Sequence, residues 1–553
     1  MSVRRAPGGR TDPGAAGSRN HGRGRGWTAF GVFLLVTAIY CLTAPGRIDS
    51  FDGQLRYEVA QSLVSVGEPL IRDPALPYYP GLDGKGYSLY GASASVAAVP
   101  LVWLGGLAPD PFLERRRFLF TMTTPIFGGM LAAVLFLFLG EIGVPARAAL
   151  RWALVSAFAS LVWPAATSVL DQVQHAFFVL LVAWCGLLAA RRRSVPLAAV
   201  ACLALAALVN YQPPYLLLVA PLALVTLARP ADGGRRDRRS WMVTAVFLLG
   251  APLGLGLIFH YNEIRFGTPL LLDQLGLGLD REPVLGNPLR GMAALLFSPG
   301  KSLFLYSPTV VLGLLGFAGL KRRSPAVAWT VAATSAIHFL FISSLSFFHG
   351  DWAWGPRYLV VLLPLWALAM PFGRSPRWLL RGLVAAAVAV QLLGLGTINE
   401  RFFFARGLEA HFWLRLDDFY FRESALLARP GEIAQVVFEG PPPEARRFAP
   451  THYPRIRTST IVGISQPSRA PEWMRGYRVF YLPRAWPLWM LLERGEKLPV
   501  PLMPAVGLLV AIAAAGALAI GRGLAAAAAA APAAADRAAV QVLSCSEPAR
   551  PTE

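Results

Sequence analysis

The chain has 553 residues, of which 55% are hydrophobic and 15% charged, and its mean hydropathy is +0.48. These values exclude a disordered chain and are atypical of a soluble globular protein. A net charge of +20 is also typical of nucleic-acid binding, but the basic residues here lie in short clusters between apolar runs. The positive-inside rule explains that pattern better. We therefore expect an all-α polytopic membrane protein with membrane lipids, and no nucleic acid, as partners.

Apolar runs of about 17 to 23 residues recur along the chain, the length that a helix needs to cross a bilayer. Residues 1–26 contain six arginines and are expected to form a disordered cytoplasmic arm before a first helix that acts as a signal anchor. The candidate spans are 27–44, 92–108, 118–140, 149–168, 172–190, 195–210, 213–228, 241–259, 303–320, 326–346, 357–372, 378–398 and 502–520.

Basic clusters determine the orientation of the later spans through the positive-inside rule. The clusters that all fall on the cytoplasmic side are 229–239, 321–324, 373–381 and 521–523. The spans of the N-terminal third do not give a consistent topology. The arm and the arginines at 191–193 both belong on the cytoplasmic side, so an even number of spans must separate them. The candidate spans between them number five. One run between 92 and 190 is therefore expected to be short, broken or re-entrant, and we expect about 12 to 13 helices.

The predicted organisation is a transmembrane module over 27–398 with a first external loop at 45–91. A small extracytoplasmic region covers 399–501 and a final transmembrane helix covers 502–520. The remainder, 521–553, is rich in alanine and reads as a disordered cytoplasmic tail.

The first external loop places two acids, Asp49 and Asp52, where the membrane surface is expected, and Arg56 follows them. An apolar stripe at helical spacing predicts an amphipathic helix on the membrane surface that opens near Asp52; its members are Leu55, Val59, Leu63 and Val66. Asp52 then has two interpretations, a helix N-cap or a functional carboxylate at the interface.

Other external segments carry polar residues that topology does not require. Lysine occurs only four times against 48 arginines, and Lys85 and Lys301 lie beside glycine in external segments. Such cations suit a phosphate at the membrane surface, although a solvated loop lysine is an equal alternative. Two further segments, "SVLDQVQHAFF" and "FFHGDWAWGPRYLVVLLP", add Asp171, His175, His349, Asp351 and Arg357. For Asp171 an N-cap is again an alternative.

The chain resembles the GT-C class of membrane glycosyltransferases, and within it the bacterial relatives of protein O-mannosyltransferases and of the lipid A aminoarabinose transferase. Three features carry the resemblance: an acid followed by "RYEVAQSLVSVG", then "GKGYSLYGASASVAAVPL", and then the series "YNEIRFGTPL", "SPGKSLFLYSP" and "HGDWAWGPRYLVVLLPL". The pattern covers roughly residues 27 to 400.

The resemblance implies transfer of a hexosyl or pentosyl group from a polyprenyl-phosphate donor to an acceptor hydroxyl outside the inner membrane, with inversion. Asp52, with Asp49 as the alternative, corresponds to the catalytic base, although Gly53 stands where many relatives have a second acid. Donor phosphate would be bound by Arg56, Lys85 and Arg357. Further candidates for the substrate site are Tyr57, Tyr87, Asp171, His175, Asn262, Lys301, His349 and Asp351.

Several alternatives stay open at the level of sequence. A polysaccharide polymerase or ligase would use the same kind of lipid donor, and a non-catalytic scaffold would need none of these acids. A secondary transporter would place ionisable residues at the midplane and show internal repeats, and the sequence shows neither pattern. The sequence leaves open the sugar, the acceptor (envelope glycan, lipid or protein) and a divalent metal cofactor.

Overall fold

The computed structural model describes residues 13–48, 50–73, 76, 78–88, 90–109, 114–270, 284–350, 352–405, 416–443, 478–493 and 499–529. This part of the chain is almost entirely helical. The N-terminal half contains α1 (Pro13–Thr43), α2 (Phe51–Val66), α3 (Ser93–Gly105), α4 (Glu114–Phe120), α5 (Thr123–Glu141), α6 (Ala146–Phe158), α7 (Val162–Ala166), α8 (Gln172–Arg192), α9 (Val195–Tyr211), α10 (Val219–Ala223), α11 (Arg238–Leu248) and α12 (Gly250–Phe266).

The C-terminal half contains α13 (Pro288–Phe297), α14 (Leu303–Tyr306), α15 (Val310–Arg323), α16 (Pro325–Ser343), α17 (Leu363–Ala367), α18 (Arg377–Gly396), α19 (Glu400–Phe404), α20 (Leu416–Arg422), α21 (Ala425–Phe438), α24 (Trp486–Leu492) and α25 (Leu502–Ala529). Short 3-10 helices are η1 (Pro213–Leu218), η2 (Leu224–Leu227), η4 (Arg357–Leu362), η5 (Met370–Phe372) and η8 (Arg478–Tyr481). Two short strands, β1 (Tyr79–Pro80) and β2 (Gly86–Tyr87), pair antiparallel.

The fold is that of an all-α polytopic membrane protein, as the sequence predicts. In the described part of the chain, seven helices are long and apolar enough to cross a membrane: Gly24–Thr43, Glu114–Glu141, Gln172–Arg192, Arg238–Phe266, Pro325–Ser343, Arg377–Gly396 and Leu502–Ala529. Four further predicted spans are shorter apolar helices: Ser93–Gly105, Val195–Tyr211, Pro213–Leu227 and Arg357–Ala367.

Two predicted spans are interrupted. The run 149–168 divides into α6 and α7, and the run 303–320 divides into α14 and α15. Each interruption lies beside a proline, Pro164 or Pro308, which has no N–H for the helical hydrogen-bond ladder. The broken run at 149–168 is one of the five candidate spans whose odd number gave an inconsistent topology for the N-terminal third.

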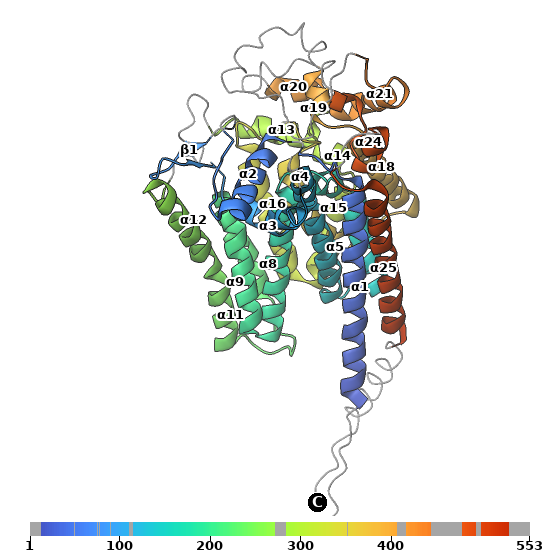
Figure 1. The fold of residues 1–553 in the computed structure, drawn as a ribbon. Coiled ribbons are helices and arrows are strands. Elements are labelled where there is room, and N and C mark those ends of the chain that lie inside the picture. Colours follow the sequence, from blue (N-terminus) through green and yellow to red (C-terminus); the bar gives the residue numbers. More distant parts are fainter. Residues whose placement is uncertain are drawn as a thin grey trace, which may run out of the picture.

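The long helices form a bundle with the small helices gathered at one end (Figure 1). At that end lie α2, α13, α20, α21 and α24. The first and last spanning helices, α1 and α25, run side by side at one edge of the bundle (Figure 1). Their backbones approach closely at glycines, since a Cβ on Gly31 would lie 2.5 Å from the carbonyl oxygen of Gly516. Small residues at such contacts are typical of helix packing in membranes.

Helix α2 packs against other parts of the protein on two sides. Leu55 and Val59 of the predicted apolar stripe are buried against Ile71. On another side of the helix, Tyr57 and Ala60 are buried in a second cluster with residues of α3 and α4. The predicted helix is therefore present, and its stripe is buried at Leu55 and Val59 but exposed at Val66.

Candidate active site at the start of helix α2

The start of α2 fixes the position of Asp52. The N-cap is Ser50, whose hydroxyl accepts a hydrogen bond of 3.0 Å from the Gly53 N–H. The N-cap interpretation of Asp52 is therefore wrong, and its carboxylate, in the first turn, is available for other contacts. Gly53 allows close packing here, because a Cβ at that position would lie 2.2 Å from Cγ2 of Val169. A larger side chain at position 53 would therefore require Val169 to shift.

The Asp52 carboxylate lies between a tyrosine and an arginine. The hydroxyl of Tyr90 donates to Oδ1 at 2.7 Å, and Nη1 of Arg357 lies 3.7 Å from Oδ2. The pKa of Tyr90 is well above its usual range, because its surroundings desolvate the phenol and the charge of Asp52 disfavours a second anion. Tyr90 therefore stays protonated as a donor. The Asp52 side chain is 24% exposed, which leaves it accessible to a ligand.

One turn further along α2, Arg56 forms a buried ion pair with Asp171. Nη2 of Arg56 lies 2.7 Å from Oδ2 of Asp171, and the two side chains are only 5% and 4% exposed. Burial is the largest influence on the pKa of Asp171 and would raise it, but Arg56, His175 and Arg357 together outweigh burial and hold this pKa well below its usual range. Asp171 occupies the N-cap position of α8 without a capping hydrogen bond from its side chain. Its carboxylate contacts Arg56 instead.

A buried polar chain continues from Asp171 into the bundle. Nε2 of His175 lies 3.4 Å from Oδ2 of Asp171, and Nδ1 lies 2.9 Å from the hydroxyl of Tyr215. Nε2 of Gln172 donates to Oδ1 of Asp171 at 3.0 Å. Both oxygens of Asp171 are thus engaged. The sequence placed Asp171 and His175 together, but nothing in it indicated Tyr215.

Arg357 approaches Asp52 from the start of η4. Its Nη2 donates to the hydroxyl of Tyr358 at 3.2 Å. Gly350 makes room for it, because a Cβ there would lie 2.6 Å from Cγ of Arg357. This glycine has a φ of +65°, in the region that favours glycine. Arg357, which the sequence analysis predicts as a ligand of the donor phosphate, therefore lies next to Asp52.

Lys301 and His349 lie together under the segment that carries Arg357. Nζ of Lys301 donates to the carbonyl oxygens of Ala353 and Gly355 at 3.0 and 3.1 Å. His349 is buried, and burial followed by the positive charges of Lys301 and Arg357 holds its pKa well below the usual range. A buried lysine that binds backbone carbonyls has a structural role in this arrangement, since it fixes the loop before Arg357.

Three other predicted residues form a separate cluster around the β1–β2 hairpin. Lys85 is exposed and paired with Glu68 and Asp83, and the Tyr87 hydroxyl donates to Asp83 at 2.9 Å. The side-chain oxygen of Asn262 accepts from Arg265 at 2.9 Å, and this arginine also stacks on Tyr87. The described partners of Asp52 include none of these residues. Lys85 therefore lies outside the Asp52 cluster.

The remaining predicted residues lie elsewhere. Tyr57 is fully buried, edge-on to Phe120 and beneath the guanidinium of Arg117. Asp49 and Asp351 fall outside the described residues. Within the described ranges, no group of three or more histidine, cysteine or acidic side chains is arranged to hold a metal ion.

Tyr90 is the site residue that sequence reasoning missed. It lies in the quoted motif "GKGYSLYGASASVAAVPL", where Tyr87 was chosen instead. No spacing rule separates the two tyrosines, because Tyr87 lies in the short strand β2 and Tyr90 in the loop between β2 and α3.

No model of a known protein family matches the chain, and no curated protein matches it either. Solved structures similar to it include ArnT from Cupriavidus metallidurans, with a TM-score of 0.45 and 13% identity over 89% of this chain and 76% of that one. The Archaeoglobus fulgidus oligosaccharyltransferase gives 0.42 and 12%, over 70% and 59%. The arabinosyltransferase EmbB from Mycobacterium smegmatis gives 0.37 and 15%, over 94% and 43%.

The chain thus spans less than two thirds of the length of the last two proteins. TM-scores below 0.5 at such identities do not by themselves assign a fold or a reaction.

Proposed function

We propose that this protein is an integral membrane glycosyltransferase that moves a sugar from a polyprenyl-phosphate donor to an acceptor hydroxyl. The observation that carries the proposal is the contrast between Asp52 and Asp171. Asp52 is accessible and holds Arg357 only loosely, at 3.7 Å, whereas Asp171 is buried and fully engaged by Arg56. A general base must reach the proton that it removes, so the base is Asp52.

The reaction places the carboxylate and the cation in different roles. Asp52 takes the proton of the acceptor hydroxyl as that oxygen bonds to the anomeric carbon, and the bond from this carbon to the phosphate oxygen breaks. The configuration is inverted. The polyprenyl phosphate leaves with the bonding electron pair, and Arg357 stabilises its added charge. Positive charge that develops on the sugar is stabilised by the nearby carboxylate.

The contact between Asp52 and Arg357 gives donor binding a second effect. A phosphate is a stronger partner for a guanidinium than a loosely held carboxylate at 3.7 Å. When phosphate draws Arg357 away, Oδ2 of Asp52 is released for the acceptor hydroxyl. The base thus becomes available when the donor is bound.

The arrangement of charges supports an extracytoplasmic site in the inner membrane. Asp171 lies at the start of α8, and the basic cluster after Arg191 lies about 30 Å further along, at the other end of this 21-residue helix. Basic residues mark the cytoplasmic side. The end that carries α2 then faces outward, where nucleotide-activated sugars are absent and a lipid-borne donor is needed.

Transfer from a panel of radiolabelled polyprenyl-phosphate sugars tests the proposal in membranes that carry the full chain. Asp52→Asn should lower transfer by about 10²- to 10⁴-fold at equal protein level, because it removes the base and keeps the shape. Asp232→Asn is the matched control, since this acid is exposed and pairs with Arg193 near the basic end of the bundle. Undiminished transfer by Asp52→Asn would exclude Asp52 as the base. Absence of transfer from every single-sugar donor would favour a polymerase, a ligase or a transporter.

A further inference from the structure

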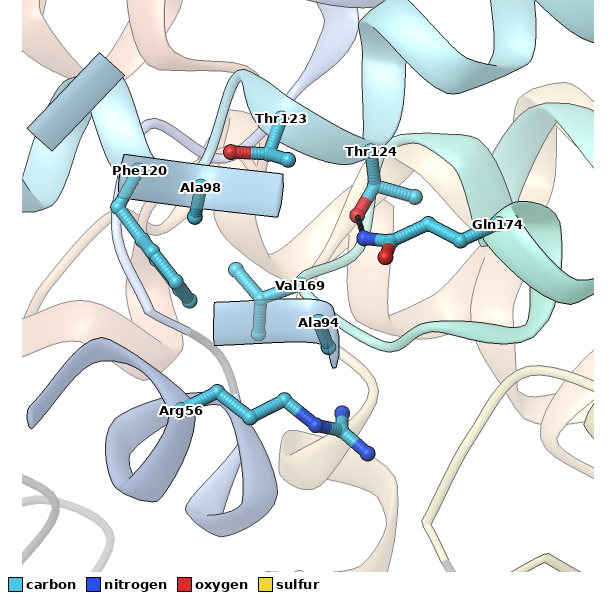
Figure 2. Close-up of a pocket in the computed structure, with 8 residues that line it drawn as sticks. All are labelled: Arg56, Ala94, Ala98, Phe120, Thr123, Thr124, Val169 and Gln174. Atoms are coloured by element: carbon cyan, nitrogen blue, oxygen red, sulfur yellow. Dashed lines mark hydrogen bonds between the residues drawn. The ribbon is translucent and has the colours of Figure 1, made fainter. Parts of the chain in front are cut away.

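Arg357 is the predicted phosphate ligand that forms an ion-pair contact with Asp52 among the described residues, at 3.7 Å. Arg56 is engaged by Asp171 and borders a small cavity that has room for about one water molecule (Figure 2). Lys85 lies in the separate cluster around the β1–β2 hairpin. The contacts that hold the segment before Arg357 therefore bear directly on where a donor phosphate can bind.

That segment is anchored by Trp354, three residues before Arg357 and only 4% exposed. Its indole lies edge-on to the ring of Tyr306, with the ring centroids 5.1 Å apart. On another side the indole touches α18, because a Cβ on Gly394 would lie 2.6 Å from Nε1 of Trp354. The carbonyl groups of the residues on either side of Trp354 are bound by Lys301. The indole thus has little room to move, and the chain reaches Arg357 from a fixed point.

A buried arginine of the extracytoplasmic region lies over the same indole. This residue is Arg429 of α21, whose side chain is fully buried and whose Cζ lies 5.0 Å from the centre of the Trp354 ring. Burial lowers the pKa of Arg429 to about 10, so it keeps its charge at neutral pH. A cation over the face of a tryptophan is attracted by the ring, and more strongly where water is excluded. Arg429 and Trp354 therefore hold each other in place.

Hydrogen bonds to the end of α18 and the residues after it orient the guanidinium. Nη1 of Arg429 donates to the carbonyl oxygen of Thr397 at 2.7 Å, and Nη2 donates to Oδ1 of Asn399 at 2.9 Å. Its Nε lies 3.4 Å from Oε2 of Glu432. A planar guanidinium bound at several nitrogens is held in one orientation, which a lysine ammonium cannot reproduce.

We propose that Arg429 is a positioning residue of the active site, which acts through Trp354 to hold Arg357 where the donor phosphate binds. This inference rests on the proposed function and gives the extracytoplasmic region a part in it. A second contact of that region supports the same role. Trp352, in the same segment, stacks on Phe403 of α19 with ring centroids 5.9 Å apart and 18° between the ring planes. Two helices of the extracytoplasmic region, α19 and α21, thus support the segment before Arg357.

Binding of undecaprenyl phosphate by the full-length protein in nanodiscs tests the proposal, with thermal stability measured on the same samples. Arg429→Lys keeps the charge and loses the planar fork, whereas Gly394→Ala displaces the indole of Trp354 from the side of α18. Each substitution should weaken lipid affinity by about 2- to 10-fold. The matched controls are Arg422→Lys, at an exposed position of α20, and Gly382→Ala, on α18 with nothing within 4 Å of an added Cβ. Both controls should leave the affinity unchanged.

The same substitutions in a chain that also carries Arg357→Gln separate positioning from a general effect on the fold. If Arg429 acts through Arg357, neither Arg429→Lys nor Gly394→Ala weakens lipid affinity further in that chain. A further loss of similar size there would overturn the proposal, since Arg429 would then support the protein as a whole. Unchanged affinity of both variants in the otherwise wild-type chain would overturn it as well. If Arg429→Lys does not fold, Gly394→Ala decides by the same criteria.

Failure of the proposed function gives a different result. If the wild type binds undecaprenyl phosphate and transfers sugar, and Arg357→Gln weakens binding while Arg429→Lys and Gly394→Ala do not, the positioning role alone is overturned. If the wild type neither binds undecaprenyl phosphate nor transfers sugar from any donor, the proposed function and the positioning role are both overturned.

Discussion

Removal of the negative partner of the buried ion pair should destabilise the protein strongly. In Asp171→Asn, the guanidinium of Arg56 keeps its charge at 5% exposure and loses a contact of 2.7 Å. Breaking a buried pair in this way costs about 3–5 kcal/mol in the free energy of unfolding. The cost arises from the charge left behind, so Arg56→Met in the same chain should recover much of it. The two substitutions are therefore expected to be far from additive.

Unfolding of the purified protein in mixed micelles, followed by tryptophan fluorescence, measures this double-mutant cycle. Asp232→Asn is the control, and it should leave stability nearly unchanged because its pair with Arg193 is exposed. The contribution of Asp171 to the free energy of unfolding also depends on pH in a definite direction. The folded-state pKa of Asp171 is lowered, so its contribution is present above the unfolded pKa of about 3.9 and is lost as the pH falls below that value. The reasoning is refuted if Asp171→Asn costs less than about 1 kcal/mol, or if the two substitutions add.

Two further changes test the cation of the site and the packing of the bundle. Arg357→Gln should lower both sugar transfer and the affinity for undecaprenyl phosphate at least about tenfold, since it removes the charge that we propose to stabilise the leaving phosphate. A loss of transfer with unchanged lipid affinity would contradict phosphate binding by Arg357. Gly31→Ala should lower the stability of the folded protein by roughly 1–3 kcal/mol, because its Cβ would lie 2.5 Å from the carbonyl oxygen of Gly516. Gly26→Ala is its control on the same helix, as nothing lies within 4 Å of a Cβ there, and equal thermal stability of the two variants would exclude the close contact.

The long helices were predictable because an apolar run of about 20 residues has few alternatives to a helix in lipid. The interruptions were partly predictable, since Pro164 and Pro308 lie inside the apolar runs 149–168 and 303–320, and one broken run is expected between 92 and 190. The packing of α2 was not predictable. Its stripe has the spacing of a surface helix, and only the fold shows that Ile71 of the following loop covers it.

The residue types of the site were predictable, and their pairing was not. Asp52, Arg56, Asp171 and Arg357 were all singled out as polar residues near the ends of apolar runs. The sequence separation of Arg56 and Asp171 is 115 residues, so no local rule connects them. The N-cap interpretation failed for Asp52 because Ser50, two residues earlier, already caps the helix. Only the structure shows that Asp52 is accessible and that Asp171 is buried.

The contact between α1 and α25 has a consequence for how the protein is made. The glycine face of α1 is inserted into the membrane early in synthesis, but the helix that covers it begins only at Leu502. Throughout translation of the intervening chain, this face is exposed to lipid or to the insertion machinery. The contact between α1 and α25 can therefore form only after the rest of the described bundle has been synthesised.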